Sequence, residues 1–329
     1  MGCYNKRPEE TNDDFFVRVG NAVLARELTW EGAAKILNDE FGKNYGECAY
    51  RKRFKAFLQG MQYQASIQNK DVGICILSIS DLHIPFQKPV ETFTEYAGKI
   101  DVLQVNGDLV DCQSISRFLK VYRKSPVEEI LIARQYMIDL IEMIHPKKVV
   151  VNYGNHDLRF QNYLAKNLDT DLIELMPKTS LELIFVDGFN HYNKELHTKV
   201  HYDPLVDVFK DSDIEIIYND TWYSIIGKTI FVHPIAYSSG MLKTAEKAYR
   251  YFKDNGFDFD CIAMAHTHKT GHYDIGKSVI YEQGCCCETL KMDYADGRLT
   301  PSQREGFILV YQDKAGKLIE DKTRIVRLN

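Results

Sequence analysis

The sequence lacks the features that mark membrane, secreted and fibrous proteins. Its 329 residues contain no uninterrupted apolar stretch near the roughly 18 residues that a membrane-spanning helix needs, and the longest candidate, Val72–Ile79, has the length of a strand. Charged side chains occupy the first 16 residues, where a signal peptide would have an apolar core. We therefore expect a soluble, cytoplasmic protein with no membrane association.

The chain also lacks a surplus of positive charge. Its 41 Lys and Arg against 46 Asp and Glu give a formal net charge of −5. This balance excludes a uniformly basic surface that would bind nucleic acid. With 45% apolar and 26% charged residues, the composition is typical of globular domains and excludes a wholly disordered chain. At roughly 150 residues per domain, the length indicates about two domains.

Cysteine is present, but not in the pattern of a disulfide scaffold. Five of the eight cysteines are scattered, whereas Cys285, Cys286 and Cys287 are consecutive. Neighbouring residues of a strand point to opposite faces, so three adjacent cysteines cannot easily turn every sulfur to one metal. We interpret them as small, semi-buried apolar residues, with a redox or metal role as the alternative.

Residues 1–60 are predicted to form a small all-α domain. Helices are expected near 13–27, 29–41 and 47–58, with Thr29 as the N-cap of the second and a turn over 42–46. Residues 1–70 hold eleven Lys and Arg against nine Asp and Glu, so the basic surplus lies in this part of the chain. On the third helix, Arg51, Lys52 and Lys55 share one flank.

A helix, a tight turn and a helix with a basic flank resemble a helix-turn-helix of the homeodomain-like or recombinase kind. Such a helix fits the major groove, and its cations neutralise phosphates. We predict that Arg51, Lys52 and Lys55 contact DNA, although no base-reading residue can be named. The alternative is a helical cap whose basic residues are merely solvated. The polar residues 61–71 are predicted to be a linker.

From residue 72 the pattern changes to short buried strands that alternate with helices. Strands are expected at 72–80, 101–106, 148–152, 229–233 and 260–265. The clearest helix has Ser125 as N-cap, Pro126 as first residue and Glu128 completing a capping box, and it ends at His145 and Pro146. This alternation predicts an α/β layered fold with functional residues where strands run out into loops. Residues 189–210 carry no signal strong enough to place and are interpreted as a loop over the active site.

All five predicted strands end in side chains that can bind metal. These side chains are Asp81 and His83, then Asp108, then Asn155, His156 and Asp157, then His233, and finally His266 and His268. Mixed imidazole, carboxylate and amide ligands without thiolate suit manganese, iron or zinc. A carboxylate such as Asp108 can bridge two cations. We therefore expect two divalent metal ions, with manganese first and iron or zinc as alternatives.

Over roughly residues 72–312, the chain resembles the calcineurin-like metallophosphoesterase superfamily. The resemblance lies in five motifs and their order, which are Asp-x-His, Gly-Asp, Gly-Asn-His-Asp, an isolated His and His-x-His. The resemblance implies a four-layer α/β/β/α sandwich, with two mixed sheets face to face, in a domain spanning 72–329. It implies that one metal is held by Asp81, His83 and His268, the other by Asn155, His233 and His266, with Asp108 between them. His156 would lie near the leaving group, with Asp157 as its partner. The chain departs from the family in having Ala265 where glycine usually precedes the first histidine of His-x-His.

The charges of such a centre indicate a mechanism. Two cations about 3.5–4 Å apart generate a bridging hydroxide that attacks phosphorus in line. His156, oriented by Asp157, would stabilise the phosphoryl charge or protonate the departing oxygen. Arg117 is a candidate phosphate contact. Arg159 is expected to serve helix packing.

The metal centre predicts phosphoester hydrolysis but does not select the substrate. Because a DNA-binding helical piece would favour nucleic acid, we predict a phosphodiesterase or nuclease that acts on DNA, nearest in kind to SbcD-type repair exonucleases and related phage-encoded proteins. One alternative is a phosphomonoesterase or protein phosphatase with an N-terminal docking module. Another is a DNA-binding regulatory protein with a vestigial metal site. Strand preference and oligomeric state stay open.

Overall fold

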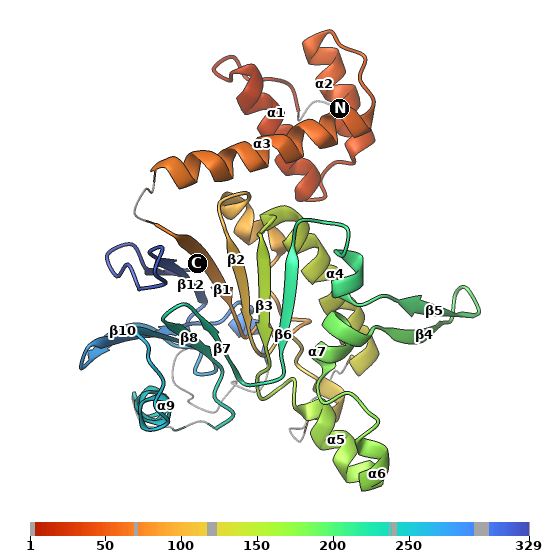
Figure 1. Ribbon diagram of the computed structural model, residues 1–329. Helices are drawn as coiled ribbons and strands as arrows, with labels where there is room; N and C mark the ends of the chain where they lie inside the picture. The colour runs from red at the N-terminus through yellow and green to blue at the C-terminus, as the bar shows by residue number, and fades with distance from the viewer. Residues whose placement is uncertain are drawn as a thin grey trace. The chain divides into compact units, whose positions relative to one another are not determined.

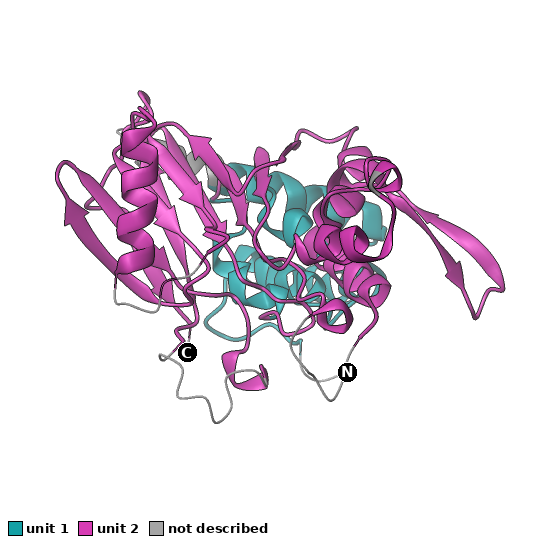
Figure 2. Cartoon of the chain, turned by 90° about the horizontal axis from the view of Figure 1, so that it is seen from below, with its two compact units in different colours: residues 1–70, 89–99, 139–145 teal, residues 71–88, 100–138, 146–329 magenta. Residues whose placement is uncertain are grey.

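The computed structural model describes residues 4–68, 72–116, 124–236, 238, 242–292 and 303–328. The chain forms two compact units, shown in different colours in Figure 2. The first comprises residues 1–70, 89–99 and 139–145, and the second comprises residues 71–88, 100–138 and 146–329. Two short segments from the predicted catalytic region thus belong with the N-terminal helices. Within the described ranges, no helix combines the length and the apolar content that crossing a bilayer requires.

The first unit begins with three helices, α1 (Asn12–Leu24), α2 (Trp30–Phe41) and α3 (Glu47–Gln68). The hydroxyl of Thr29 accepts from the backbone N–H of Gly32, which confirms the predicted N-cap of α2. The helix ends where Gly42 adopts a left-handed conformation with φ of 61°. Aromatic rings fill the core between the helices, where Phe16 packs edge-on against Phe54.

The prediction that residues 61–71 form a linker is wrong for residues 61–68, because α3 continues to Gln68. Residues 69–71 lie outside the described part of the chain. The extension contains no proline, and five of its eight residues are Gln, Met or Ala, which have favourable helix propensities. Loss of apolar periodicity along the sequence therefore did not mark the end of the helix.

Two mixed sheets build the second unit (Figure 1). The six-stranded sheet has the order β13 (Arg324–Arg327), β12 (Gly306–Gln312), β1 (Ile74–Ile79), β2 (Val102–Asn106), β3 (Lys148–Asn152) and β6 (Glu215–Asn219). The five-stranded sheet has the order β10 (Thr270–Ile275), β11 (Ser278–Gln283), β9 (Cys261–Met264), β8 (Thr229–Val232) and β7 (Tyr223–Ile226). Strands β1, β2, β3 and β6 run parallel, as do β8, β9 and β11.

The sheets pack face to face around an apolar core. Ile76, Val150 and Ile308 of the first sheet meet Phe231 and Ala263 of the second. Helix α9 (Lys243–Asp254) covers the outer face of the five-stranded sheet and buries Phe252 there. Helix α4 (Pro126–Ile144) lies outside the six-stranded sheet in Figure 1. These layers confirm the predicted α/β sandwich.

Local signals in the sequence located the central elements well. The predicted strand 148–152 is β3, and the other four predicted strands end within a residue of β1, β2, β8 and β9. The capping box of α4 is formed, since Ser125 N–H donates to Glu128 at 2.8 Å and Glu128 N–H donates to the Ser125 hydroxyl at 3.2 Å.

The remaining elements lie between these strands or after them. They are α5 (Arg159–Asn167), α6 (Thr170–Ile173), α7 (Ser180–Glu182), α8 (Leu205–Val208) and the short helices Val90–Tyr96, Gln113–Ile115, Leu183–Asp187 and Thr289–Lys291. The stretch 189–210 is not an irregular loop, because β4 (Phe189–Asn193) and β5 (Thr198–Tyr202) pair in a hairpin that projects from the second unit in Figures 1 and 2.

Candidate metal centre

The ends of five strands bring the predicted ligands into one buried cluster. Asp81 and His83 follow β1, Asp108 follows β2, and Asn155 follows β3 in the six-stranded sheet. His233 follows β8, and His266 and His268 follow β9 in the five-stranded sheet. Because the carboxyl ends of parallel strands meet at one edge of a sheet, both sheets deliver their side chains to the same region.

One group of donor atoms gathers around Asp81. The Nε2 atom of His268 lies 3.1 Å from Asp81 Oδ1 and 3.1 Å from His83 Nε2. The donor atoms of these three side chains all lie within 4.8 Å of one another. This spacing fits one ion held by three ligands, as the family resemblance implied.

A second group gathers around Asp108. The Nε2 atom of His233 lies 3.2 Å from Asp108 Oδ2 and 3.3 Å from Asn155 Oδ1. The donor atoms of Asp108, His233 and His266 lie within 4.8 Å of one another. Asp108 Oδ2 is also 3.9 Å from His83 Nε2, so this carboxylate lies between the two groups. The structure thus brings together all seven residues, whose role as ligands stays a prediction.

The backbone of the ligand-bearing turns is strained. The five residues with a left-handed backbone among the predicted ligands are Asp81, His83, Asp108, His266 and His268, with φ between 46° and 75°. Such conformations cost of order 1–3 kcal/mol each in a non-glycine residue and persist where the surrounding structure imposes them. Ala265 is not among the residues with positive φ. The departure from glycine at this position is therefore accommodated without left-handed strain.

Glycine is required where the backbone passes closest to the cluster. A Cβ atom on Gly154 would lie 2.2 Å from Asp108 Oδ1 and 2.8 Å from His233 Nε2. A Cβ atom on Gly107, whose φ is 76°, would lie 2.6 Å from His233 Nδ1. Both glycines flank ligands in the motifs, and their lack of a side chain lets the turns approach each other.

Asn106 fixes the tautomer of His233. The Nδ1 atom of His233 lies 2.8 Å from the carbonyl oxygen of Asn106, which can only accept, so Nδ1 carries a proton and Nε2 is the ring atom that faces Asp108. The Asn106 side chain donates to the carbonyl oxygens of Val232 at 3.3 Å and Ala263 at 3.2 Å, and to Gln283 at 3.4 Å. It therefore links the two sheets beside the cluster.

Mutual charge controls the ionisation of the cluster. Burial opposes the charged form of Asp81, yet the imidazoles of His268 and His233 hold its pKa well below the ordinary value. Burial likewise opposes a charged His233, but the carboxylates of Asp108 and Asp81 raise its pKa to about 9. Burial lowers the pKa of His266 to about 4, assisted by the neighbouring His233. Burial also opposes the charged form of Asp108, but the imidazole of His233 lowers its pKa. The carboxylates of Asp81 and Asp108 thus both stay ionised within the protein interior.

The carboxylate that orients His156 is Asp111, and the prediction of Asp157 for this role is wrong. Asp111 Oδ1 lies 2.9 Å from His156 Nδ1 and 3.4 Å from His83 Nδ1. Asp157 instead accepts the backbone N–H groups of Asp108 and Gly154, both at 2.8 Å, and so ties two ligand turns together. Adjacency in the Gly-Asn-His-Asp motif had favoured Asp157. The position of Asp111, three residues after Asp108, was the signal that could have identified it.

A fully buried environment surrounds these two carboxyl groups. Burial opposes ionisation of Asp111, but hydrogen bonds from His156 and His83 hold its pKa well below the ordinary value. Burial and the charge of Asp108 raise the pKa of Asp157 to about 7. Burial also lowers the pKa of His156 to about 4, against the attraction of Asp108. His156 is therefore a neutral imidazole, and Nδ1 is its ring nitrogen nearest to Asp111.

Arg159 lies in the site, and the expectation that it serves helix packing is wrong. Its Nη2 atom is 2.9 Å from His156 Nε2, and its Nη1 atom donates to the carbonyl oxygen of Asp111 at 2.7 Å. The contact with Nε2 supports the Nδ1-protonated form of His156, since a guanidinium can only donate. Arg117, the predicted phosphate contact, lies outside the described residues.

The donor set fits a pair of divalent cations. In Asp81, Asp108, His83 and His233, one polar atom faces the cluster and the other contacts a backbone group or Asp111. Such outer contacts orient metal ligands and raise their basicity. Bound cations would offset the charge of two carboxylates buried among four imidazoles, and both kinds of side chain are metal ligands. Manganese as the bound metal stays a prediction.

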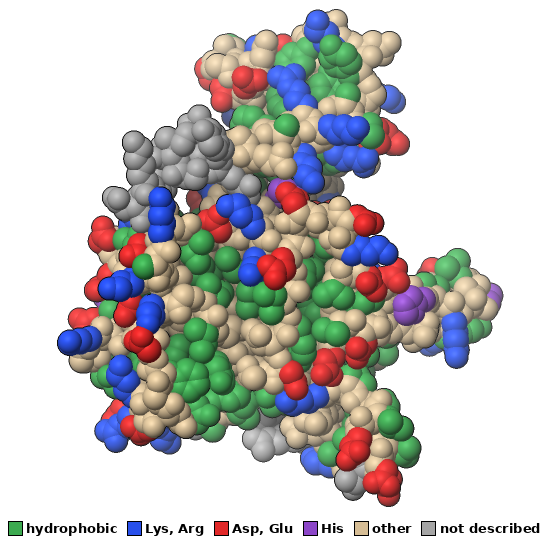
Figure 3. Space-filling view, in the orientation of Figure 1, with side chains coloured by type: hydrophobic (Ala, Val, Ile, Leu, Met, Phe, Trp, Pro, Cys, Tyr) green, Lys and Arg blue, Asp and Glu red, His purple; other side chains and the backbone are tan. Residues whose placement is uncertain are grey.

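The predicted DNA contacts Arg51, Lys52 and Lys55 are exposed on α3 of the first unit. In Figure 3, Lys and Arg side chains lie over the visible face of these helices, with Asp and Glu beside them. Arg53 donates to Asp13 at 3.3 Å and lies over the ring of Phe16, and Arg51 donates to the sulfur of Cys48 at 3.5 Å. Whether the three cations bind DNA stays a prediction.

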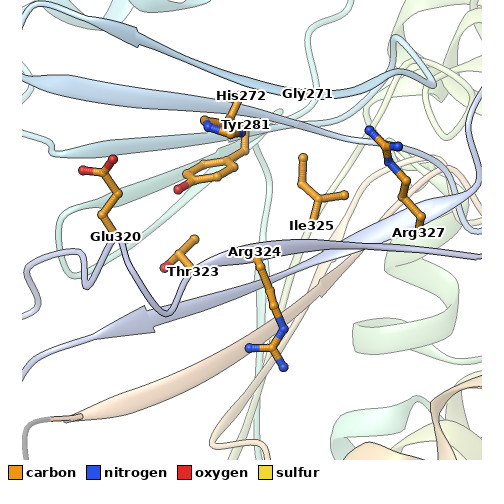
Figure 4. Close-up of a pocket in the computed structure, with 8 residues that line it drawn as sticks. All are labelled: Gly271, His272, Tyr281, Glu320, Thr323, Arg324, Ile325 and Arg327. Carbon is orange, nitrogen blue, oxygen red and sulfur yellow. The ribbon is translucent and has the colours of Figure 1, made fainter.

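A separate cavity of about 660 Å³ lies between β10, β11 and β13 (Figure 4). His272 and Tyr281 face each other across the paired strands with ring centroids 5.6 Å apart, and Arg324 and Arg327 come from β13. None of its lining residues belongs to the ligand cluster. The cluster is therefore distinct from this cavity.

Comparison with solved structures gives low similarity over most of the chain. Vps29 from Entamoeba histolytica in complex with zinc is 14% identical, covers 78% of this chain and 98% of its own, and has a TM-score of 0.36. An archaeal phosphodiesterase is also 14% identical, covers 78% of this chain and 100% of its own, and has a TM-score of 0.32. At these values, neither likeness bears on the activity of this chain.

Comparison of the sequence is more informative. A SPbeta prophage-derived uncharacterized protein, YonJ, of Bacillus subtilis strain 168 is 32% identical over 59 residues, which are 18% of this chain and 15% of that protein's length. Residues 3–69 match the family described as the YonJ N-terminal domain. Residues 75–270, more than half of the sequence, match the family described as calcineurin-like phosphoesterase. With its ligand cluster at the strand ends of a two-sheet sandwich, the chain belongs to the calcineurin-like phosphoesterase family.

Proposed function

We propose that this protein is a phosphodiesterase that hydrolyses DNA, with the second unit supplying the hydrolytic centre and the three N-terminal helices binding the substrate. The observation that carries the hydrolytic half is the convergence of Asp81, Asp108 and four histidines from two sheets into one cluster. The exposed cations of α3 support the DNA half, because phosphate neutralisation dominates the affinity of proteins for nucleic acid.

The residues beside the cluster divide the chemical work. Two divalent cations, when bound, lower the pKa of a coordinated water and offset phosphate charge. Asp111 holds His156 through Nδ1, so the ring keeps Nε2 directed toward the cluster, 3.9 Å from Asp108 Oδ2. A bound phosphate anion would favour a proton on Nε2, which His156 then gives to the departing oxygen while Asp111 stabilises the imidazolium.

Arg159 is the second residue to which we assign substrate contact. Its guanidinium lies against His156 Nε2 and is 17% exposed at the side-chain level, so one face of it is accessible. A guanidinium presents paired donors that match phosphate oxygens. Substrate would thus take the place of His156 as the partner of Nη2.

The experiment compares substrates on the full chain reconstituted with manganese. A bis-aryl phosphate and a mono-aryl phosphate are assayed side by side, followed by labelled single-stranded and double-stranded DNA. We expect metal-dependent hydrolysis of the diester in preference to the monoester, together with DNA cleavage. A strong monoester preference without DNA cleavage would favour a phosphomonoesterase or protein phosphatase with a docking module. The absence of any metal-dependent hydrolysis would favour a vestigial site.

Charge-matched variants test the role of the helices. Replacing Arg51, Lys52 and Lys55 with Gln should weaken DNA binding and reduce the dependence of log K on log salt by about 3 for double-stranded DNA. The control replaces Lys243, Lys247 and Arg250, exposed on α9, with Gln. Both triple variants should hydrolyse the small diester at the same rate. Equal DNA affinities for the two would contradict DNA binding by α3.

A further inference from the structure

The consecutive cysteines lie beside the cluster in an alternating arrangement. They follow β11 and Gly284, and Cys285 and Cys287 each form a β-bridge, with Glu305 and Gln87, on either side of a bend at Cys286. The donor atoms of Cys285 and Cys287 approach each other, whereas the Cys286 thiol contacts the carbonyl oxygen of Gly306 at 3.5 Å.

Two further donors complete a group of soft ligands. The sulfurs of Cys285 and Cys287 and a ring nitrogen of His268 lie within 4.8 Å of one another. The thioether sulfur of Met292 lies 3.4 Å from Cys287 Sγ. The three sulfur-bearing side chains are at most 2% exposed and form one small buried cluster, against which Phe86 packs.

We propose that Cys285, Cys287, His268 and Met292 form a binding site for a soft d¹⁰ cation such as Zn²⁺, Cd²⁺ or Cu⁺. Thiolate and thioether sulfurs select such ions, whereas the carboxylate and imidazole cluster next to it also accommodates harder ions such as Mn²⁺. Two thiolates would offset the charge of a divalent ion, which a buried site requires. Spacings of a few ångströms between the donors fit metal–sulfur bonds of about 2.3 Å.

This site is coupled to the neighbouring cluster through His268. The Nε2 atom of His268 is already close to Asp81 and His83, at 3.1 Å from each. A soft ion that draws on the same ring competes for it with an ion held by Asp81 and His83. Filling the sulfur site should therefore weaken manganese binding at the other.

Cadmium provides a direct probe, because its bonds to thiolates give an ultraviolet charge-transfer absorption that carboxylate and imidazole ligation does not. We expect this absorption when the metal-depleted full chain is titrated with Cd²⁺ under anaerobic conditions. The double variant Cys285→Ser, Cys287→Ser should lose it, and Met292→Leu should weaken cadmium binding. Cys286→Ser is the matched control, since it changes the adjacent buried thiol, and it should keep the absorption.

Each result bears on the proposal. Retention of the absorption in the double variant, or an equal loss in Cys286→Ser, would overturn the site. Because buried substitutions can unfold a domain, zinc-edge X-ray absorption of the unaltered protein supplies a second measurement. A shell of sulfur scatterers around zinc is expected, and a shell of oxygen and nitrogen alone would contradict the proposal. Competition with Mn²⁺ is read from the paramagnetic resonance of released manganese, independently of any hydrolysis.

Discussion

At the scale of single residues, the site depends on a carboxylate outside the ligand set. Asp111 is fully buried and contacts both His156 and His83 through their Nδ1 atoms. A carboxylate in this position fixes which nitrogen of each ring carries the proton. Asp111 therefore connects the predicted proton donor with a predicted metal ligand.

We predict that Asp111→Asn lowers kcat on the order of 10–100-fold at saturating metal, because an amide cannot stabilise imidazolium at His156. The measurement is steady-state hydrolysis of the small diester, with bound metal counted in the same sample. Asp254→Asn, which makes the same chemical change at the exposed end of α9, is the control. An unchanged kcat in the buried variant would exclude positioning by Asp111.

His156 and Asp108 are predicted to fail in different ways. Asp108 lies between the two donor groups, so Asp108→Ala should lose the metals and with them the activity. His156→Ala should keep the metals and lose on the order of 10²–10⁴-fold in rate. Elemental analysis and single-turnover hydrolysis separate the two outcomes. If His156→Ala emptied the site while activity per bound metal persisted, the assigned roles would be reversed.

At the scale of elements, the sequence predicted what local chemistry determines. Five buried strands and the capping box of α4 carry their signals within a few neighbouring residues. The edge strands β10 and β13 have half-exposed residues and therefore weak patterns, and they were not predicted. The buried strands β11 and β12 were not predicted either, although their residues are almost all buried. The same division applies to the site. Motif order identified the ligand types, whereas the contacts of Asp111 and Arg159 arise only from tertiary packing.

The continuous helix α3 is tested by glycine substitution. Gly60 lies within α3, and a Cβ atom there meets nothing within 4 Å, so Gly60→Ala should stabilise the helix by about 1 kcal/mol. Gly46 immediately precedes the helix, where alanine is a poorer cap, so Gly46→Ala should have the opposite sign. Hydrogen exchange of the amides of residues 59–68 provides the measurement. If these amides exchanged in the unaltered protein as fast as in an unfolded chain, the segment would be a linker, as the sequence predicted.

At the scale of the whole molecule, metal binding should stabilise the second unit, because its ligands come from both sheets. Chelation is expected to lower the midpoint of its thermal unfolding. Free metal at 100 times its dissociation constant should restore about 2.7 kcal/mol. The Asp108→Ala variant should show no dependence on metal. If the midpoint of thermal unfolding of the unaltered protein changed neither with chelator nor with added metal, assembly of the ligands into a shared centre would be contradicted.

The side chain of Asn106 has a mechanical consequence. It joins β2 to the residues at the ends of β8 and β9 and to Gln283 of β11, and its own carbonyl holds His233. A pulling force that separates the two sheets would load these bonds in parallel with the ligand cluster. We therefore expect the two sheets to separate first at the edge away from the ligand cluster. The force needed to unfold the sandwich should measure how strongly these hydrogen bonds hold the sheets together beside the cluster.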